Sequence, residues 1–208
     1  MYFARSTTVQ GDPEAVDDAI SYIGEEEFPS VTQMGGCVGL SMLADRANGR
    51  CVVATSWADE QAMKESAAKV RPMQDRLMQI MGADDALIQR WDVAVVHRER
   101  PSGDDARAQV TWARISPDAV DRLLEAFRSS LVPRLQELPG FCSLSMVVDR
   151  KAGRAIGVTS FESRDAFERT RKEARAMREE FMRAVGARVT DVAEMDLVVA
   201  HFHVPETV

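Results

Sequence analysis

The sequence predicts an α+β fold made of two tandem copies of one unit, each ordered strand, helix, strand, strand, helix, strand. The main observation is an internal repeat at the spacing from Pro29 to Pro133, 104 residues (133 − 29). The same offset carries Leu40–Met42 onto Leu144–Met146 without a gap. The second observation is that apolar runs of strand length alternate with amphipathic helical stretches in each copy.

Composition excludes several classes of protein. The 208 residues carry a net charge of −7, which argues against non-specific binding to nucleic acid or to an anionic membrane surface. We expect no signal segment and no membrane helix, because no apolar run approaches the roughly 20 residues needed to cross a bilayer. The three cysteines are odd in number and form no Cys-x-x-Cys pair, which favours a reducing cytoplasm.

Each copy is expected to open with a strand, at about residues 3–9 and 107–113. Asp12 and Ser116 follow, and each precedes a proline, which is typical of a capped helix start. Apolar residues at helical spacing continue from there, with charged residues on the other face. Pro29 and Pro133 are expected to bend or end the first regular stretch of these helices.

A hairpin, a second helix and a last strand complete each copy. Gly49 and Gly153 stand late in the two hairpin turns, where a positive φ is required. Asp59 and Ser163 are expected to cap the second helices. The remaining strands are expected at about residues 38–44, 51–57 and 91–97 of the first copy, and 142–148, 155–161 and 195–203 of the second.

This order of elements is the ferredoxin-like βαββαβ arrangement, an antiparallel sheet with helices on one face. We expect repeat 1 at residues 1–98 and repeat 2 at 106–208, joined by a polar linker at 99–105. Apolar residues occupy both alternating sets of strand positions, so both faces of each sheet need cover. The sequence therefore predicts an intrachain pseudo-two-fold dimeric α/β barrel, acting as a monomer or, alternatively, as a homodimer.

A longer pattern recurs at Gly36–Met63 and Gly140–Phe167: a glycine, an apolar strand, a turn, a strand ending in Trp or Phe, and a capped helix. This pattern resembles the antibiotic biosynthesis monooxygenase (ABM) domains of the dimeric α/β-barrel superfamily, in a tandem duplicated form. The likeness covers nearly the whole chain, twice. It concerns the fold more than the chemistry, because the pattern contains no catalytic group.

The resemblance implies a cofactor-independent monooxygenase acting on an aromatic or hydrophobic small molecule. Such a reaction needs an apolar pocket and one or two polar groups that help to remove a proton before O₂ reacts. The family also includes haem-degrading enzymes, but the Asn of the first strand and the Trp and His of the second helix that they use are missing here. A non-catalytic small-molecule-binding or structural barrel protein is the alternative, and neither interpretation requires a cofactor.

Two histidines occupy equivalent strand ends, His97 and His201. A histidine there could act as a general base for a phenolic substrate, and the alternative is a partly exposed strand-end side chain. His203 shares a strand face with His201, but the sequence offers no third ligand for a metal ion. His97 and His201 are therefore the catalytic candidates, and no metal site is predicted.

Four residues of the first repeat are candidates for substrate binding. Arg5, Thr7 and Arg71 would supply polar contacts, and Trp57 an aromatic wall. The alternatives are a solvated helix face for Arg71 and core packing for Trp57.

Trp112 is the candidate of the second repeat, because its counterpart in the first repeat, Thr8, is small. An added indole fills much of a small cavity. We therefore expect Trp112 to fill the cavity of the second repeat, so that the first repeat keeps the larger pocket.

Overall fold

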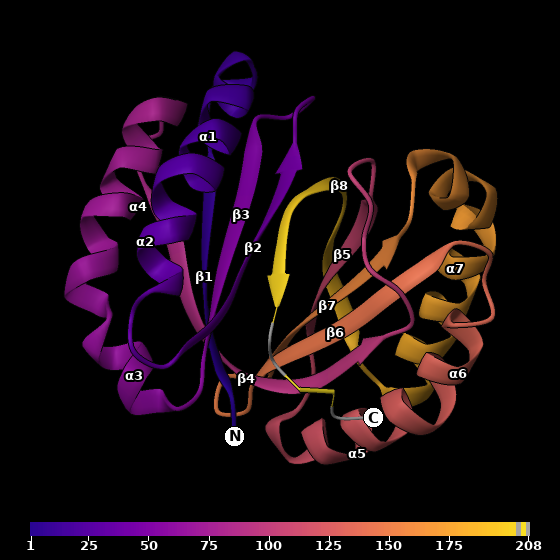
Figure 1. Cartoon of the computed structure of the whole chain (residues 1–208). Helices are drawn as coiled ribbons and strands as arrows, with labels where there is room; N and C mark the ends of the chain where they lie inside the picture. The colour runs from indigo at the N-terminus through magenta and orange to yellow at the C-terminus, as the bar shows by residue number, and fades with distance from the viewer. Residues whose placement is uncertain (203–204, 207–208) are drawn as a thin grey trace. The chain divides into compact units, whose positions relative to one another are not determined.

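The computed structural model describes residues 1–202 and 205–206, which fall into two compact units. The first unit comprises Met1–Trp91 with the described part of Met195–Val204. The second comprises Asp92–Glu194 with the described part of Pro205–Val208. In each unit helices pack against one face of a sheet built from antiparallel strand pairs (Figure 1), and each unit has its own hydrophobic core.

The first unit follows the predicted order of elements. The carboxylate of Asp12 accepts a hydrogen bond from the Glu14 N–H at 2.9 Å, and that of Asp59 accepts one from the Ala62 N–H at 2.8 Å, so both predicted helix caps form. Its elements are β1 (Phe3–Gln10), a 3₁₀ turn (Pro13–Ala15), α1 (Val16–Tyr22), a π-helical turn (Ile23–Glu27), α2 (Phe28–Thr32), β2 (Cys37–Asp45), β3 (Arg50–Trp57), α3 (Glu60–Glu65), α4 (Ala67–Met81) and the start of β4 (Ala86–Arg98).

The second unit repeats this order with small changes. Ser163 caps its helix through the Ala166 N–H at 3.1 Å, but Ser116 makes no cap, because its hydroxyl is hydrogen-bonded to the carboxylate of Asp118 instead. Its elements are β5 (Arg107–Arg114), a 3₁₀ turn (Pro117–Ala119), α5 (Val120–Ala126), a π-helical turn (Phe127–Leu131), α6 (Val132–Leu135), β6 (Phe141–Asp149), β7 (Arg154–Phe161), α7 (Arg164–Val185) and the start of β8 (Arg188–Phe202).

The strand pairing has the same register in both units. Arg5 stands opposite Thr55 between β1 and β3, and Gln109 stands opposite Thr159 between β5 and β7. Since β4 and β8 each contribute segments to both units, the hydrogen-bonded order β1-β3-β2-β8-β5-β7-β6-β4 closes on itself as an eight-strand barrel. The α+β fold class with two ferredoxin-like repeats and a barrel is thereby confirmed.

The last strands are longer than predicted. β4 begins at Ala86 and β8 at Arg188, several residues before the expected starts. The first residues of β4 are mostly exposed, with Leu87 and Ile88 among the exposed large apolar side chains of the unit, so the burial pattern used for prediction is weak there. The predicted end of the last strand at His203 lies outside the described residues.

The prolines of the first helices do not end them. Each regular helix gives way to a π-helical turn just before Pro29 or Pro133, and helical structure then continues through the proline. The wider turn accommodates a residue that lacks an N–H and would crowd the preceding carbonyl groups of an α-helix. In the first unit this turn carries Glu27, whose side chain points into the buried side of the helix and is 3% exposed.

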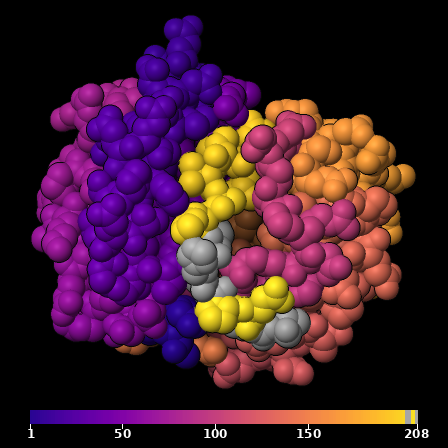
Figure 2. Space-filling view, viewed as in Figure 1, coloured from indigo at the N-terminus to yellow at the C-terminus, as the bar shows by residue number. Residues whose placement is uncertain are grey.

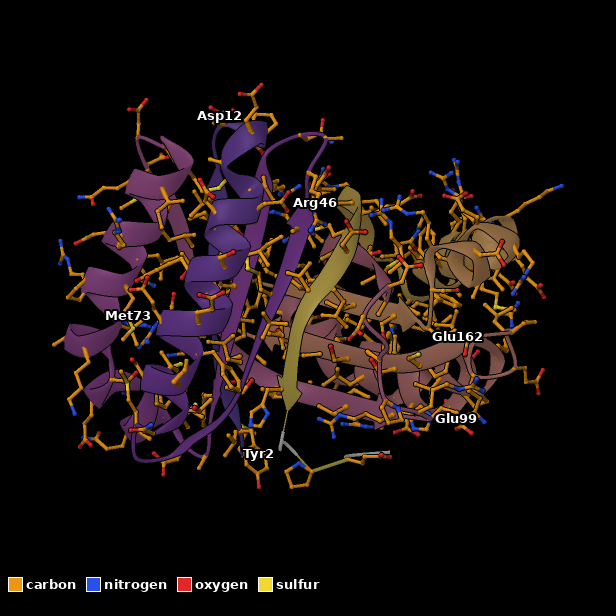
Figure 3. All side chains as sticks on the ribbon, turned by 45° about the horizontal axis from the view of Figure 1, so that its top comes forward. Tyr2, Asp12, Arg46, Met73, Glu99 and Glu162 are labelled. Atoms are coloured by element: carbon orange, nitrogen blue, oxygen red, sulfur yellow. The ribbon has the colours of Figure 1, made fainter. Side chains whose placement is uncertain are left out.

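In the space-filling view, the indigo surface of the first unit belongs to the first residues of the chain, which include α1 and α2 (Figure 2). A charged contact ties the β2–β3 hairpin to its neighbours. Arg46, in that turn (Figure 3), donates to Asp17 of α1 at 2.9 Å and to Asp196 of β8 at 2.6 Å. All three residues belong to the first unit, and burial of the ion pairs is partial, so their contribution to stability is small.

Candidate functional site

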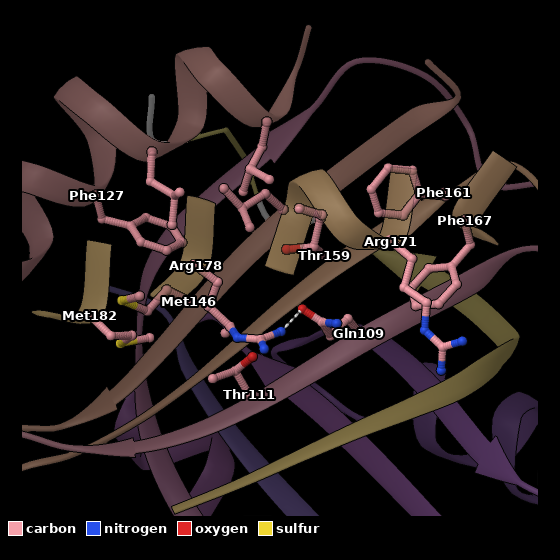
Figure 4. A pocket seen from close by; sticks show the side chains of 15 residues that line it. Gln109, Thr111, Phe127, Met146, Thr159, Phe161, Phe167, Arg171, Arg178 and Met182 are labelled. Atoms are coloured by element: carbon pink, nitrogen blue, oxygen red, sulfur yellow. Dashed lines mark hydrogen bonds between the residues drawn. The ribbon is translucent and has the colours of Figure 1, made fainter. Parts of the chain in front are cut away.

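A pocket lies in the second unit between the sheet and the helices that cover it (Figure 4). Strands β5, β6 and β7 supply its floor, and the π-helical turn, α6 and α7 supply its roof. The cavity measures about 30 Å³ as space open to the centre of a water molecule. A volume this small leaves room for a few waters in this conformation.

The walls of the pocket are mainly apolar and aromatic. Phe161 and Phe167 meet edge to face with ring centroids 5.7 Å apart, and Phe127 stands on the π-helical turn. Met146 from β6 and Met182 from α7 close the side next to Phe127 (Figure 4). Such walls favour a flat apolar ligand, and the methionines can adapt to its shape.

One charged group reaches into this apolar space. The guanidinium of Arg178, on α7, donates a hydrogen bond from Nη1 to the side-chain oxygen of Gln109 (Figure 4). Its Nε is buried and has no hydrogen-bond partner among the described residues. Burial, the largest influence, lowers the pKa of Arg178, although an arginine stays charged at any ordinary pH. Thr111 and Thr159 provide hydroxyls on the same floor.

A second arginine of the lining, Arg171, is different because its charge is balanced. Its Nε donates to a carboxylate oxygen of Glu194 at 2.8 Å, and Nη1 lies 3.2 Å from Glu168. The hydrogen bond that Arg171 donates to Glu194 is the main cause that raises the pKa of Arg171. Arg171 is exposed, so it belongs to the rim of the pocket.

Small residues keep the pocket open. Gly157 of β7 lines it, and a Cβ atom built on Gly157 would meet no atom within 4 Å. Ala174 of α7 faces the same space. At the offset of 104 residues their counterparts are Val53 and Val70, which are both buried in the core of the first unit.

The corresponding place in the first unit is filled by a network of buried polar side chains. Arg5 donates from Nη1 to the Ser66 hydroxyl at 3.1 Å and from Nη2 to the Met63 carbonyl, and its guanidinium carbon lies 6.0 Å from the ring centroid of Trp57. The indole N–H of Trp57 donates to Thr55 at 3.1 Å. Burial, followed by repulsion from Arg90, lowers the pKa of Arg5.

Three further residues, Thr7, Gln74 and Glu27, belong to this filled interior. The side-chain amide of Gln74 donates to the Thr7 hydroxyl at 2.7 Å, and both side chains are buried. Glu27 takes the place that Leu131 has in the second unit, and burial raises its pKa from 4.5 to about 7. The first unit therefore packs polar groups against one another where the second leaves a cavity.

The structure brings together three of the predicted binding residues and separates the others. Arg5, Thr7 and Trp57 all lie in the buried interior of the first unit, and Trp57 is fully buried. Arg71 is exposed on α4 and takes no part in that network, as expected for a solvated helix face.

The expectation that Trp112 fills the second cavity is wrong. Trp112 is half-buried on β5, where it follows Thr111, and successive strand residues point to opposite faces of a sheet. Because Thr111 lines the pocket, Trp112 faces the other side and is absent from the lining. The pocket consequently lies in the repeat that was expected to be plugged.

The two catalytic candidates lie in different units. His97, at the end of β4, stacks on Phe141 of the second unit with ring centroids 6.1 Å apart. Its Nδ1 is 3.7 Å from the carboxylate of Glu206, and its Nε2 is 4.0 Å from that of Glu99 (Figure 3 labels Glu99). Within the described part of the chain neither ring nitrogen has a hydrogen-bond partner, and His97 is not part of the pocket lining.

His201 pairs with Leu40 between β8 and β2, and its ring meets Phe28 edge to face at 4.9 Å. His203 lies outside the described residues. Among residues 1–202 and 205–206 no three His, Cys, Asp or Glu side chains are grouped for a metal ion. No helix in the described part of the chain is long and apolar enough to span a bilayer.

The lining residues Gln109, Gly157 and Arg178 were missed from sequence. Each was hidden because the search favoured identities between the copies, whereas these positions differ: Gln109 replaces an arginine, Gly157 a valine and Arg178 a glutamine. The usable signal was the change in side-chain volume at equivalent positions. Gly157 for Val53 would have indicated the more open repeat.

Relatives with similar sequences come from Mycobacterium tuberculosis. The uncharacterized protein Rv2558 is 41% identical over 207 residues, covering 99% of this chain and 87% of its own length. The uncharacterized protein Rv2557 is 37% identical over 206 residues, covering 99% of this chain and 92% of its own length. No protein-family model matches the chain.

Solved structures share the fold at low sequence identity. A "putative monooxygenase" from Lactobacillus acidophilus has a TM-score of 0.70 at 10% identity, covering 97% of this chain and 96% of its own. An anthrone oxidase-like protein has a TM-score of 0.68 at 15% identity, covering 97% and 93%. These matches concern the fold alone, and at that level the resemblance to ABM proteins is confirmed.

Proposed function

Since this chain belongs to the family of the mycobacterial proteins Rv2558 and Rv2557 and has an ABM-like fold, we propose that its second-unit pocket binds an aromatic or hydrophobic small molecule and supports its cofactor-independent monooxygenation. The single observation that carries the proposal is the aromatic-walled pocket into which one half-buried charged group, Arg178, projects from α7. The similar fold of the anthrone oxidase-like protein points to the same reaction class.

The reaction proposed is oxidation of an acidic CH₂ group that adjoins an aromatic ketone. Loss of one proton to water leaves an enolate, whose oxygen the guanidinium of Arg178 would stabilise. The enolate carbon then reduces O₂ to a hydroperoxide, and loss of water from that hydroperoxide gives a carbonyl. One O₂ is consumed for each CH₂ converted to C=O, and the second oxygen atom leaves as water.

A binding protein without catalysis is the second candidate, and one observation favours it. The described lining contains no His, Asp, Glu, Tyr or Cys, so the protein offers no side chain of suitable pKa as a proton acceptor. A substrate whose CH₂ group is acidic enough to lose its proton to water is therefore required for the catalytic proposal.

The three cysteines are unpaired, and the cytoplasm is the compartment we propose for either function.

Oxygen uptake separates the two candidates. With 1,8-dihydroxyanthrone we expect one O₂ consumed for each quinone formed, at a rate above the spontaneous oxidation, and we expect the rate to fall to the spontaneous value in Gly157→Val, which fills the pocket. Saturable binding of the anthrone with no added O₂ uptake would assign the non-catalytic function. A full rate in Gly157→Val would place any activity outside this pocket.

A further inference from the structure

We propose that the ligand of the second-unit pocket is an organic anion, a flat apolar molecule with one carboxylate, and that Arg178 is the residue that recognises its charge. The proposal rests on the proposed function only in using the same pocket. It names a ligand class that the fold alone does not supply. Arg178 brings a positive charge to an apolar cavity, and its hydrogen bond is to a neutral amide oxygen.

Arg178 is half-buried, and the buried part of its guanidinium lacks an acceptor among the described residues. Its one hydrogen bond runs from Nη1 to the neutral side-chain oxygen of Gln109, and its Nε is buried without any acceptor among the described residues. Removing a charged group from water is unfavourable unless an opposite charge or several hydrogen bonds replace the lost solvation. A bound carboxylate would supply both, because it accepts two parallel hydrogen bonds from a guanidinium.

The buried arginine of the first unit shows what a satisfied site looks like. Arg5 has the Ser66 hydroxyl, the Met63 carbonyl and the face of Trp57 around its guanidinium. At the position equivalent to Arg178 the first unit has Gln74, a neutral residue that bonds Thr7. Of the two units, only the second therefore has an arginine at this position, and the Nε of that arginine has no acceptor among the described residues.

Among residues 1–202 and 205–206, no carboxylate is hydrogen-bonded to Arg178. Glu194 is hydrogen-bonded to Arg171 at 2.8 Å, and Glu179, the residue next to Arg178 in α7, is hydrogen-bonded to Arg175 at 2.7 Å. Both acids act on Arg178 only through longer-range attraction. The unpaired charge is thus directed at the cavity, where Phe127 and Phe161 would hold the apolar body of the ligand.

The small volume of the cavity indicates how binding proceeds. With space for only a few waters, the pocket must widen to admit an aromatic ring. Exchange of the Gln109 amide for a ligand carboxylate releases Arg178 from the floor strand, and the lining methionines can shift with it. The Gln109–Arg178 contact is therefore the resting state that a ligand replaces.

Benzoate and benzamide test the proposal, because they have the same size and differ in charge. With the wild-type chain, the dissociation constant measured by titration calorimetry or NMR should be at least tenfold lower for benzoate than for benzamide. Arg178→Gln, which installs the residue found in the first unit, should abolish this preference and leave benzamide binding within about twofold. Arg175→Gln removes an exposed arginine one turn away on the same helix and should leave the preference intact.

Three outcomes would contradict the proposal. Equal affinities for benzoate and benzamide, a preference that survives Arg178→Gln, or absence of saturable benzoate binding up to millimolar concentration would overturn it. Thermal unfolding is the control, and we expect Arg178→Gln to unfold cooperatively at a temperature close to that of the wild-type chain. Anthrone oxidation with no preference for benzoate would refute the anionic ligand and retain the monooxygenase, whereas Arg178-dependent benzoate binding without O₂ uptake would do the reverse.

Discussion

The space between helices and sheet is filled by side chains in the first unit and contains a cavity in the second. In the first unit Arg5, Thr7 and Gln74 bond to neighbouring groups and fill the space. In the second, Gly157 and Ala174 leave a cavity, and Arg178 projects into it without a full set of acceptors. After a duplication, one copy can keep a binding function while the other serves mainly as a packed scaffold, and a change of a few side-chain volumes is enough to separate them.

The largest effect expected is the loss of stability when the filled unit is opened. Val53→Gly gives the first unit the residue that the second has, but Val53 is buried among apolar side chains, so the change leaves a void and weakens a strand. We expect the free energy of unfolding in urea to fall by about 3 kcal/mol. A fall below about 1 kcal/mol would mean that the first interior is not tightly packed.

A second effect depends on pH and concerns Glu27. Its pKa is raised to about 7 in the folded state from the ordinary 4.5, so the folded protein keeps a proton that the unfolded chain releases. Stability contributed by this group therefore falls as pH rises from about 4.5 to 7 and stays low above that. The difference of about 2.5 pKa units corresponds to about 3 kcal/mol at most.

Glu27→Leu, which installs the residue of the second unit, should remove this dependence. Urea unfolding at pH 8 should show a gain approaching that limit, and at pH 5 a much smaller one. Glu26→Leu alters the exposed neighbour and serves as the control, with no difference between the two pH values expected. An equal gain at both pH values would show that Glu27 is not a buried acid.

A smaller effect on stability is expected from filling the open unit. Gly157→Val adds a branched side chain to a strand where a new Cβ meets no atom within 4 Å, so the fold should gain up to about 1 kcal/mol. Benzoate affinity should fall at least tenfold, because the added methyl groups occupy the cavity. Gly157→Ala should give an intermediate loss. Unchanged benzoate affinity in Gly157→Val would contradict this placement of the site.

Features that the two copies share could be predicted from the sequence, whereas features that depend on differences between the copies could not. The repeat and the apolar periodicity determine the strand order and most helix caps, because these follow from local patterns that both copies share. The pocket follows from differences between the copies, such as Gly157 for Val53 and Arg178 for Gln74. The side toward which Trp112 points depends on strand register, which the sequence alone left open.

The π-helical turns had no sequence signal beyond the prolines that follow them. Pro29 and Pro133 indicated a disturbance, and the structure resolves it as a wide turn rather than a bend or an end. Buried Glu27 was likewise invisible, since a glutamate on an amphipathic helix is usually assigned to the solvated face. Tertiary packing decided both features.

The most direct test of the central claim, that the second unit alone holds the ligand site, uses methionine methyl groups. Met146 and Met182 line the pocket, and their counterparts in the first unit are Met42 and Met78. In a chain labelled with ¹³C-methyl methionine and assigned through single Met→Leu variants, titration with benzoate should shift the signals of Met146 and Met182 saturably and leave those of Met42 and Met78 in place. Shifts confined to Met42 and Met78, or equal in both pairs, would contradict the account.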